Sequence, residues 1–190
     1  NSLNLKPTVD LYVTGSNAYM LSSEIATLLS GRYVEIAMLP LSFKEYAEGI
    51  GGTDHLSQTY IEYVSKSSFP YTLELDTANE ISDYLNAVYN TIVVKDIMSR
   101  NKLSDVMMLE SVIRFTADNI GNILSTKRIA DLMSADGRKI DQKTVEKYLS
   151  TLCESFFLYE VKRYNIKGKQ LLKTLGKYYL VDIGLRRMLL

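Results

Sequence analysis

The polar side chains of this sequence that could take part in chemistry are few and widely spaced. Asn17 follows a short apolar run, where a strand is expected to end, and Arg32 lies between Gly31 and the next apolar run. Open α/β sheets bind ligands beyond the carboxyl ends of their strands, so the Asn17 amide could orient a water near a terminal phosphate. The Arg32 guanidinium could reach a phosphate held by a neighbouring subunit. On spacing alone, a turn-forming asparagine and a solvated arginine remain the alternatives.

The other candidates for catalysis lack partners. His55 is the only histidine and Cys153 the only cysteine, which excludes a disulfide framework and a zinc site built from several such ligands. No convincing serine or cysteine lies near His55 in the sequence, so we expect a surface histidine. Cys153 falls on the apolar face of its helix beside Leu149 and Leu152, which predicts a core position.

The glycine-rich stretch does not fit a phosphate-binding loop. Residues 49–52 read Gly-Ile-Gly-Gly but follow a helical pattern rather than a strand, which is typical of a helix-to-helix connector. The chain contains neither a G-x-x-x-x-G-K-[ST] pattern nor an apolar strand that ends in an Asp-Glu pair able to hold magnesium. We therefore expect this chain alone to be non-catalytic and to bind no metal.

The charge of the chain is balanced overall but divided along its length. Of the 190 residues, 46% are apolar, and 22 basic residues match 22 acidic ones. Residues 1–124 carry a net charge of −7, whereas residues 125–190 carry +7. This asymmetry predicts two parts with different partners. The apolar runs are too short to span a membrane, so we expect a soluble, cytoplasmic protein that makes no membrane contact.

The N-terminal pattern predicts part of an α/β sheet. A strand is expected over residues 9–13, a helix over 22–29 and a second strand over 33–39. Strands joined in this way are parallel, and two parallel strands cannot cover both faces of a sheet. We therefore expect the chain to be a segment of a longer protein and to self-associate as a dimer or larger species.

The middle of the sequence is expected to be helical. Ser42 with Glu45, and Thr77 with Glu80, have the spacing of capping boxes that begin helices. After the second box, apolar residues recur every three to four positions, as in an amphipathic helix. The expected helices cover residues 42–49, 54–65, 77–100 and 105–119.

The last third has the pattern of a winged helix-turn-helix. A short helix over residues 126–133 is followed by a turn and by a longer helix that Asp141 can cap. Strands over 159–164 and 171–181 then flank a turn, as a wing would. A helix of this kind beside a basic hairpin is a candidate duplex DNA surface, and packing or protein docking is an equal alternative. The candidate DNA-binding residues are Arg138, Lys139, Lys143, Lys147, Arg163, Lys167 and Lys169.

Three blocks of the sequence resemble a family of prokaryotic AAA+-type ATPases that carry a C-terminal domain of unknown function. The blocks are LYVTGSNA at residues 11–18, LLSGRYVE at 28–35 and LPLSFKEY at 39–46. The resemblance implies that Asn17 acts as a first sensor and that Arg32 is an arginine finger. The phosphate-binding loop and the magnesium-binding acidic pair of that family lie upstream of this segment. ATP and Mg²⁺ are therefore expected only in the full-length protein.

The resemblance and the residue patterns together predict a mostly helical fold with a small α/β part. Residues 1–41 would be the end of an ATPase core with a truncated parallel βαβ unit, 42–102 a helical lid and 103–190 a winged-helix domain. The expected function is to couple ATP binding and hydrolysis in the full-length protein to a DNA or protein partner. Its other partner would be the remaining ATPase core. The alternative is a stand-alone winged-helix module that binds DNA or docks a protein, with no nucleotide role.

Overall fold

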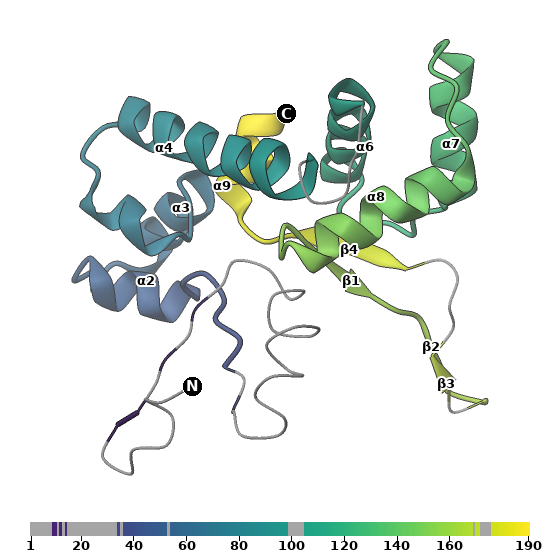
Figure 1. Cartoon of the computed structure of the whole chain (residues 1–190). Coiled ribbons are helices and arrows are strands. Elements are labelled where there is room, and N and C mark those ends of the chain that lie inside the picture. The colour runs from purple at the N-terminus through teal and green to yellow at the C-terminus, as the bar shows by residue number, and fades with distance from the viewer. Residues whose placement is uncertain are drawn as a thin grey trace.

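A computed structural model shows a mostly helical protein with a small antiparallel sheet (Figure 1). It describes residues 9–10, 12, 14, 34, 36–52, 54–98, 105–168, 170–171 and 176–190. Within them, no helix is long and apolar enough to cross a bilayer. Two groups of helices stand side by side, and a β-hairpin extends from the second group.

The first group of helices begins at the two predicted capping boxes. Ser42 Oγ accepts a hydrogen bond from the Glu45 backbone N–H at 3.3 Å, and the Glu45 carboxylate accepts one from the Ser42 N–H at 2.8 Å. Thr77 and Glu80 make the same reciprocal pair at 3.2 and 2.9 Å. Each box satisfies two N–H groups that a helix end leaves unpaired. The elements of this group are α2 (Phe43–Gly49), α3 (Leu56–Ser65), the 3₁₀ turn η3 (Pro70–Glu74), α4 (Ala78–Asn90) and the π-helical η4 (Thr91–Met98).

The second group contains three helices, each with a side chain that caps its first turn. Asp105, Ser125 and Asp141 accept hydrogen bonds from N–H groups three residues further along. The helices are α6 (Val106–Asp118), α7 (Thr126–Ala135) and α8 (Gln142–Glu154). Their positions agree with the predicted helices over 105–119 and 126–133 and with the cap expected at Asp141.

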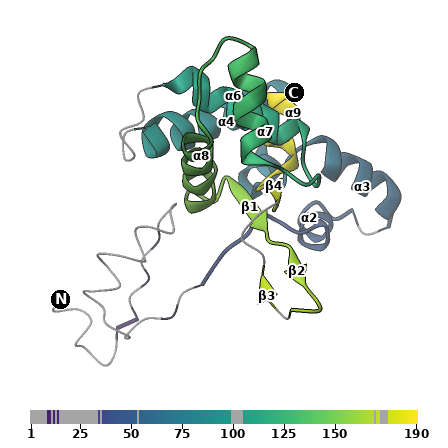
Figure 2. The same cartoon turned by 90° about the vertical axis from the view of Figure 1, so that its right-hand side faces the viewer.

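The predicted strand–turn–strand is present, and the described residues contain two short pieces of each strand. Strand β1 (Leu158–Val161) pairs antiparallel with β4 (Lys177–Leu180). The hairpin continues as β2 (Tyr164–Asn165) and β3 (Gln170–Leu171), which also pair antiparallel. The backbone of Ile123 forms an isolated antiparallel bridge with Lys177. The hairpin therefore projects well beyond the helices of the second group (Figures 1 and 2).

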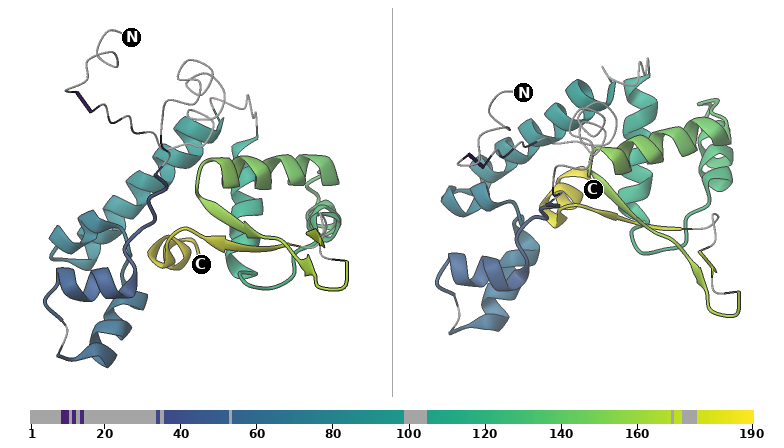
Figure 3. Two further views of the ribbon diagram at one scale, coloured as in Figure 1. Left: turned by 90° about the horizontal axis from the view of Figure 1, so that it is seen from below. Right: turned by 60° about the horizontal axis from the view of Figure 1, so that its bottom comes forward.

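A C-terminal helix that the sequence patterns did not predict joins the two groups. Helix α9 (Ile183–Leu189) contacts α3 and α4 on one side and α6 and β4 on the other (Figure 3). Residues of both groups share one hydrophobic core, which includes Leu85, Leu109, Leu152, Phe157 and Leu185. The predicted lid and the predicted winged-helix region are thus packed together, and their boundaries at 41/42 and 102/103 stay predictions.

The described sheet differs from the predicted one in position and in direction. It is antiparallel and lies within residues 158–180. The predicted strand over 9–13 falls only partly, and the predicted helix over 22–29 not at all, within the described residues. At residues 34 and 36–39, where the second parallel strand was expected, the described backbone forms no strand. Val34 and Met38 are 87% and 88% exposed. A strand requires a hydrogen-bonded neighbour, and no described residue pairs with this segment.

Candidate functional site on α8 and the hairpin

Helix α8 has one buried face and one charged face. Val145, Tyr148 and Leu152 are buried against the core. Lys143 and Lys147 are exposed, and their i, i+4 spacing places them on the same side of the helix. The α8 N-terminus is therefore oriented by core packing, while its two lysines face solvent.

The Asp141 side chain fixes the beginning of α8. Its carboxylate accepts the Thr144 backbone N–H at 2.7 Å. That hydrogen bond is the main cause that lowers the pKa of Asp141 below its usual value. The carboxylate therefore remains charged and keeps the first turn of α8, including Lys143, in place.

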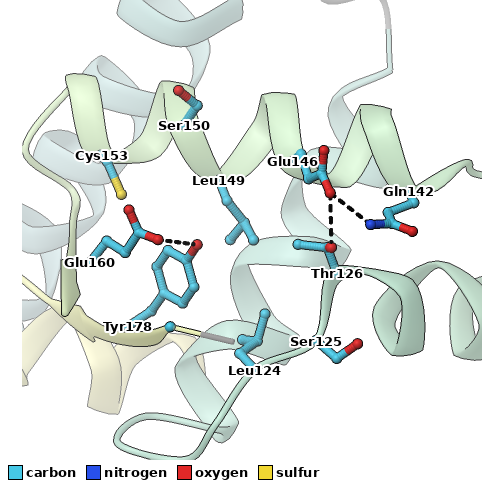
Figure 4. Close-up of a pocket in the computed structure, with 11 residues that line it drawn as sticks. Leu124, Ser125, Thr126, Gln142, Glu146, Leu149, Ser150, Cys153, Glu160 and Tyr178 are labelled. Atoms are coloured by element: carbon cyan, nitrogen blue, oxygen red, sulfur yellow. Dashed lines mark hydrogen bonds between the residues drawn. The ribbon is translucent and has the colours of Figure 1, made fainter. Parts of the chain in front are cut away.

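The exposed side of α8 is not uniformly basic. Glu146 accepts hydrogen bonds from Thr126 Oγ1 at 3.2 Å and from Gln142 Nε2 at 2.8 Å (Figure 4). Glu154, near the end of α8, accepts one from Ser150 Oγ at 3.0 Å. Two carboxylates thus lie on the helix that carries the two lysines.

The hairpin adds basic and apolar side chains outside the helical body. Arg163 and Lys167 are exposed. The Nζ atom of Lys162 lies 3.8 Å from Oε2 of Glu160. Tyr164 and Ile166 are 55% and 81% exposed. The hairpin can thus contribute cations and apolar surface to a contact, while Lys169 lies outside the described residues.

Arg138 is held against another helix. In the turn between α7 and α8, its guanidinium donates to Ser111 Oγ and, at 3.4 Å, to the carbonyl of Met107. Both acceptors belong to α6. Lys139 is exposed in the same turn. The structure therefore associates Arg138 with α6 and leaves Lys143, Lys147, Arg163 and Lys167 as the exposed candidates on α8 and the hairpin.

The remaining predicted site residues are not assembled into a catalytic centre within the described residues. Asn17 and Arg32 lie outside these residues. His55 is exposed at the N-cap position of α3, where its side chain makes no capping hydrogen bond. Among the described residues, no group of three or more His, Cys, Asp or Glu side chains could hold a metal ion.

Cys153 is less buried than the sequence pattern predicted. It is partly buried beside the core rather than within it. Burial raises the pKa of its thiol to about 12, and the negative charge of Glu160 acts in the same direction. Since the thiolate is the nucleophilic form, Cys153 is a poor nucleophile at neutral pH.

A pocket lies beneath α8 between the start of α7 and the β1–β4 sheet (Figure 4). Its volume is about 410 Å³, which is within the range of small-molecule sites. Sequence patterns give no signal for it, because its walls come from four separate segments. The lining residues are Leu124, Ser125, Thr126, Gln142, Glu146, Leu149, Ser150, Cys153, Glu160, Gly176 and Tyr178.

Glu160, which lines the pocket together with Glu146, is held by the sheet. Oε1 of Glu160 accepts the Tyr178 hydroxyl at 3.3 Å. Burial raises the pKa of Tyr178, and the charge of Glu160 raises it further, so the phenol remains a donor. A Cβ atom at Gly176 would lie 3.1 Å from Glu160 Oε1, so glycine leaves room for this carboxylate. No lysine or arginine is among the described residues that line the pocket.

Comparisons with known proteins identify the C-terminal part. The family model described as a domain of unknown function (DUF8612) matches residues 57–190. The chain belongs to this family. A second model, described as an AAA domain, matches residues 2–47. The DUF8612 region thus begins within α3 and contains every later described element, including α8 and the pocket, and the AAA match precedes it.

The curated relatives are uncharacterized proteins. One, from Haemophilus influenzae, is 40% identical over 98% of this chain and 47% of its own length. Another, from Methanocaldococcus jannaschii, is 24% identical over 91% of this chain and 41% of its own length. The chain therefore spans less than half the length of either relative. No solved structure matches it.

Proposed function

We propose that this chain is the middle segment of an AAA-type ATPase, in which a winged helix binds duplex DNA and responds to the nucleotide. The AAA match over residues 2–47, which precedes the DUF8612 match over residues 57–190, supports the ATPase relationship. ATP and Mg²⁺ would be bound by the rest of the full-length protein. Asn17 would act there as a sensor and Arg32 as an arginine finger.

The order of elements after residue 105 supports a winged helix. Helix α6 is followed by the Ile123 bridge, then by α7 and α8, and then by the paired strands β1 and β4. In this arrangement α8 is the recognition helix and the β2–β3 extension is the wing. An α-helix of this size fits the major groove of B-form DNA.

The observation that carries the DNA proposal is the set of four exposed cations on these two elements. Lys143 and Lys147 lie on one side of α8, and Arg163 and Lys167 lie on the hairpin. Phosphate contacts by such residues supply most of the sequence-independent affinity of a DNA-binding protein. The charge asymmetry of the chain agrees with this, because residues 125–190 carry the excess of basic residues.

Helix α9 offers a physical link between the predicted lid and the winged helix. Arg187 donates to the carbonyl of Ser65, at the end of α3, at 2.7 Å. Arg186 donates to the carbonyl of Ala117, in α6, at 3.0 Å. Asp182 accepts the Ser68 backbone N–H at 2.7 Å. We call these three contacts the α9 clasp. Through the clasp, a displacement of the lid during the ATP cycle would also move α6 and the helices packed against it.

A protein partner is the second candidate, and the apolar side chains of the hairpin favour it. Tyr164 and Ile166 are exposed on a segment that projects from the body. Exposed apolar groups of this kind are typical of docking surfaces. In this case the winged helix would transmit the nucleotide state to a protein instead of to DNA.

Fluorescence anisotropy of a labelled random duplex, titrated with this chain at several salt concentrations, tests the DNA proposal. Binding weakens as salt rises, and each phosphate contact steepens the falling slope of log affinity against log salt by roughly 0.9. The double substitution Lys143→Ala with Lys147→Ala should reduce that slope by about 2 and weaken binding on all sequences. Lys44→Ala removes an exposed lysine of α2 and serves as the control. Absence of binding at low salt would reject DNA and leave protein docking.

A further inference from the structure

The first group of helices is strongly acidic. Residues 42–98, which contain this group, have three lysines against nine acidic residues, a net charge of −6. Two of the three lysines already pair with a glutamate one helical turn away. Lys44 Nζ lies 3.8 Å from Glu48 Oε1, and Lys66 contacts Glu62. The acidic residues of this group thus far outnumber the cations that can pair with them inside it.

Several of these carboxylates lie around the beginning of α4, beside an exposed tyrosine. Glu74, Asp76 and Asp83 are exposed, and no ion pair joins them to a described lysine or arginine. The ring of Tyr71 is 5.1 Å from that of Tyr84, the residue that follows Asp83 on α4. Tyr71 itself is 51% exposed. We call Tyr71, Glu74, Asp76 and Asp83 the acidic face.

The β-hairpin has the opposite charge and a similar share of apolar surface. Arg163 and Lys167 are exposed, and so are Tyr164 and Ile166 between them. We call these four residues the hairpin tip. Protein interfaces place apolar side chains at their centre and polar ones at the rim, with charges of opposite sign facing each other. The hairpin tip and the acidic face match in both respects.

The two surfaces are too far apart to meet within one molecule. The beginning of α4 lies at one end of the protein, and the hairpin projects from the other end (Figures 1 and 3). A contact between them therefore requires two copies of the chain. Such a contact is head-to-tail, because one copy contributes its hairpin tip and the other its acidic face.

We propose that the hairpin tip docks on the acidic face of a second copy of this chain. Tyr164 and Ile166 pack against Tyr71, and the cations of the tip pair with the carboxylates around α4. Each copy keeps one unused surface of each kind, so the contact can extend into larger species or close into a ring. The contact does not depend on DNA binding. The tip carries two of the four cations proposed to contact DNA, so one tip cannot make both contacts at once.

Light scattering on the intact chain at low and high salt measures this contact. At low salt the mass should be at least twice that of one chain, and it should fall toward the mass of one chain at high salt, because salt screens exposed charges. The double substitution Asp76→Lys with Asp83→Lys reverses the charge of the acidic face and should give a monomer at low salt. Asp131→Lys with Asp136→Lys adds the same charge at exposed positions elsewhere and should leave the mass unchanged.

A second charge reversal makes the test specific to the two surfaces. Arg163→Glu with Lys167→Glu should also give a monomer at low salt. In an equal mixture of the two reversed variants, the native tip of one meets the native acidic face of the other, and the two reversed surfaces are again opposite in charge. The mixture should therefore recover the mass that each variant alone has lost, which also shows that both are folded.

Three results would overturn the proposal. The first is a wild-type chain that is monomeric at low salt. The second is self-association that persists in both reversed variants, since the contact would then lie on another surface. The third is a mixture that stays monomeric. Duplex binding is measured separately by anisotropy, so a failure of this contact and a failure of the DNA proposal are distinguishable.

Discussion

The α9 clasp depends on a buried carboxylate whose removal should destabilise the whole protein. Asp182 is 2% exposed and accepts four hydrogen bonds. The donors are Ser67 Oγ at 3.0 Å, Ser68 N at 2.7 Å, Ser68 Oγ at 2.7 Å and Leu185 N at 2.8 Å. In Asp182→Ala the hydroxyls can turn toward other acceptors, but the two backbone N–H groups cannot. Each buried, unsatisfied N–H costs about 1–3 kcal/mol, so the expected loss is about 2–6 kcal/mol.

Urea unfolding followed by circular dichroism measures this loss. A loss of about 2 kcal/mol in a chain of this size lowers the Tm by roughly 4–8 °C. Asp182→Asn keeps an acceptor for Leu185 N but turns an amide N–H₂ toward the Ser68 N–H, so its loss should be intermediate. Asp141→Ala, at the exposed cap of α8, is the matched control and should cost less. If Asp182→Ala cost below about 1 kcal/mol, or no more than Asp141→Ala, the clasp would not hold the two groups together.

Three further predictions concern the core, a cap and the thiol. Leu109→Ala, at a fully buried position, should cost about 2–5 kcal/mol by urea unfolding, whereas Leu132→Ala, at a site 44% exposed, should cost much less; equal costs would contradict the assigned core. Hydrogen bonds from Thr77 lower the pKa of Glu80 in the folded protein. The stability that the ionised Glu80 side chain adds to the fold should therefore be complete above about pH 4.5 and be lost as the pH falls through the lowered pKa. Glu80→Gln and wild type should then differ in unfolding free energy at neutral pH and converge in acid, and a constant difference would refute this. Alkylation of Cys153 should accelerate about tenfold per pH unit beyond pH 9.0, because its pKa is raised to about 12; a plateau near pH 9.0 would refute the burial of the thiol.

Helix starts could be predicted from the sequence because their signals are local. Ser42 with Glu45, Thr77 with Glu80, and Asp141 each satisfy N–H groups within their own first turn. No distant residue is needed for such a signal, and all three caps were confirmed.

The elements that depend on distant contacts could not be predicted in this way. Helix α9 has only seven residues, and its capping residue Asp182 is buried against Ser67 and Ser68, which lie more than a hundred residues earlier. The strand expected over 33–39 would need a neighbouring strand, and the described residues provide none. A short apolar run therefore indicates a strand only where a pairing partner is present.

The candidate site was predicted only in part, for the same reason. Exposed lysines such as Lys143 and Lys147 follow from helical spacing alone. The contact of Arg138 with α6 and the pocket between Glu146 and Glu160 arise from segments that meet only in the folded chain. Neither could be read from spacing along the sequence.

The most direct test of the central claim is ATP hydrolysis by the full-length protein with and without duplex DNA. The proposed coupling predicts that duplex DNA changes the hydrolysis rate of the wild-type protein. It also predicts that the ratio of the two rates returns toward unity when Lys143 and Lys147 are replaced by alanine, and that Lys44→Ala leaves this ratio unchanged. A hydrolysis rate that does not respond to duplex DNA, or a response that survives removal of both lysines, would contradict the account.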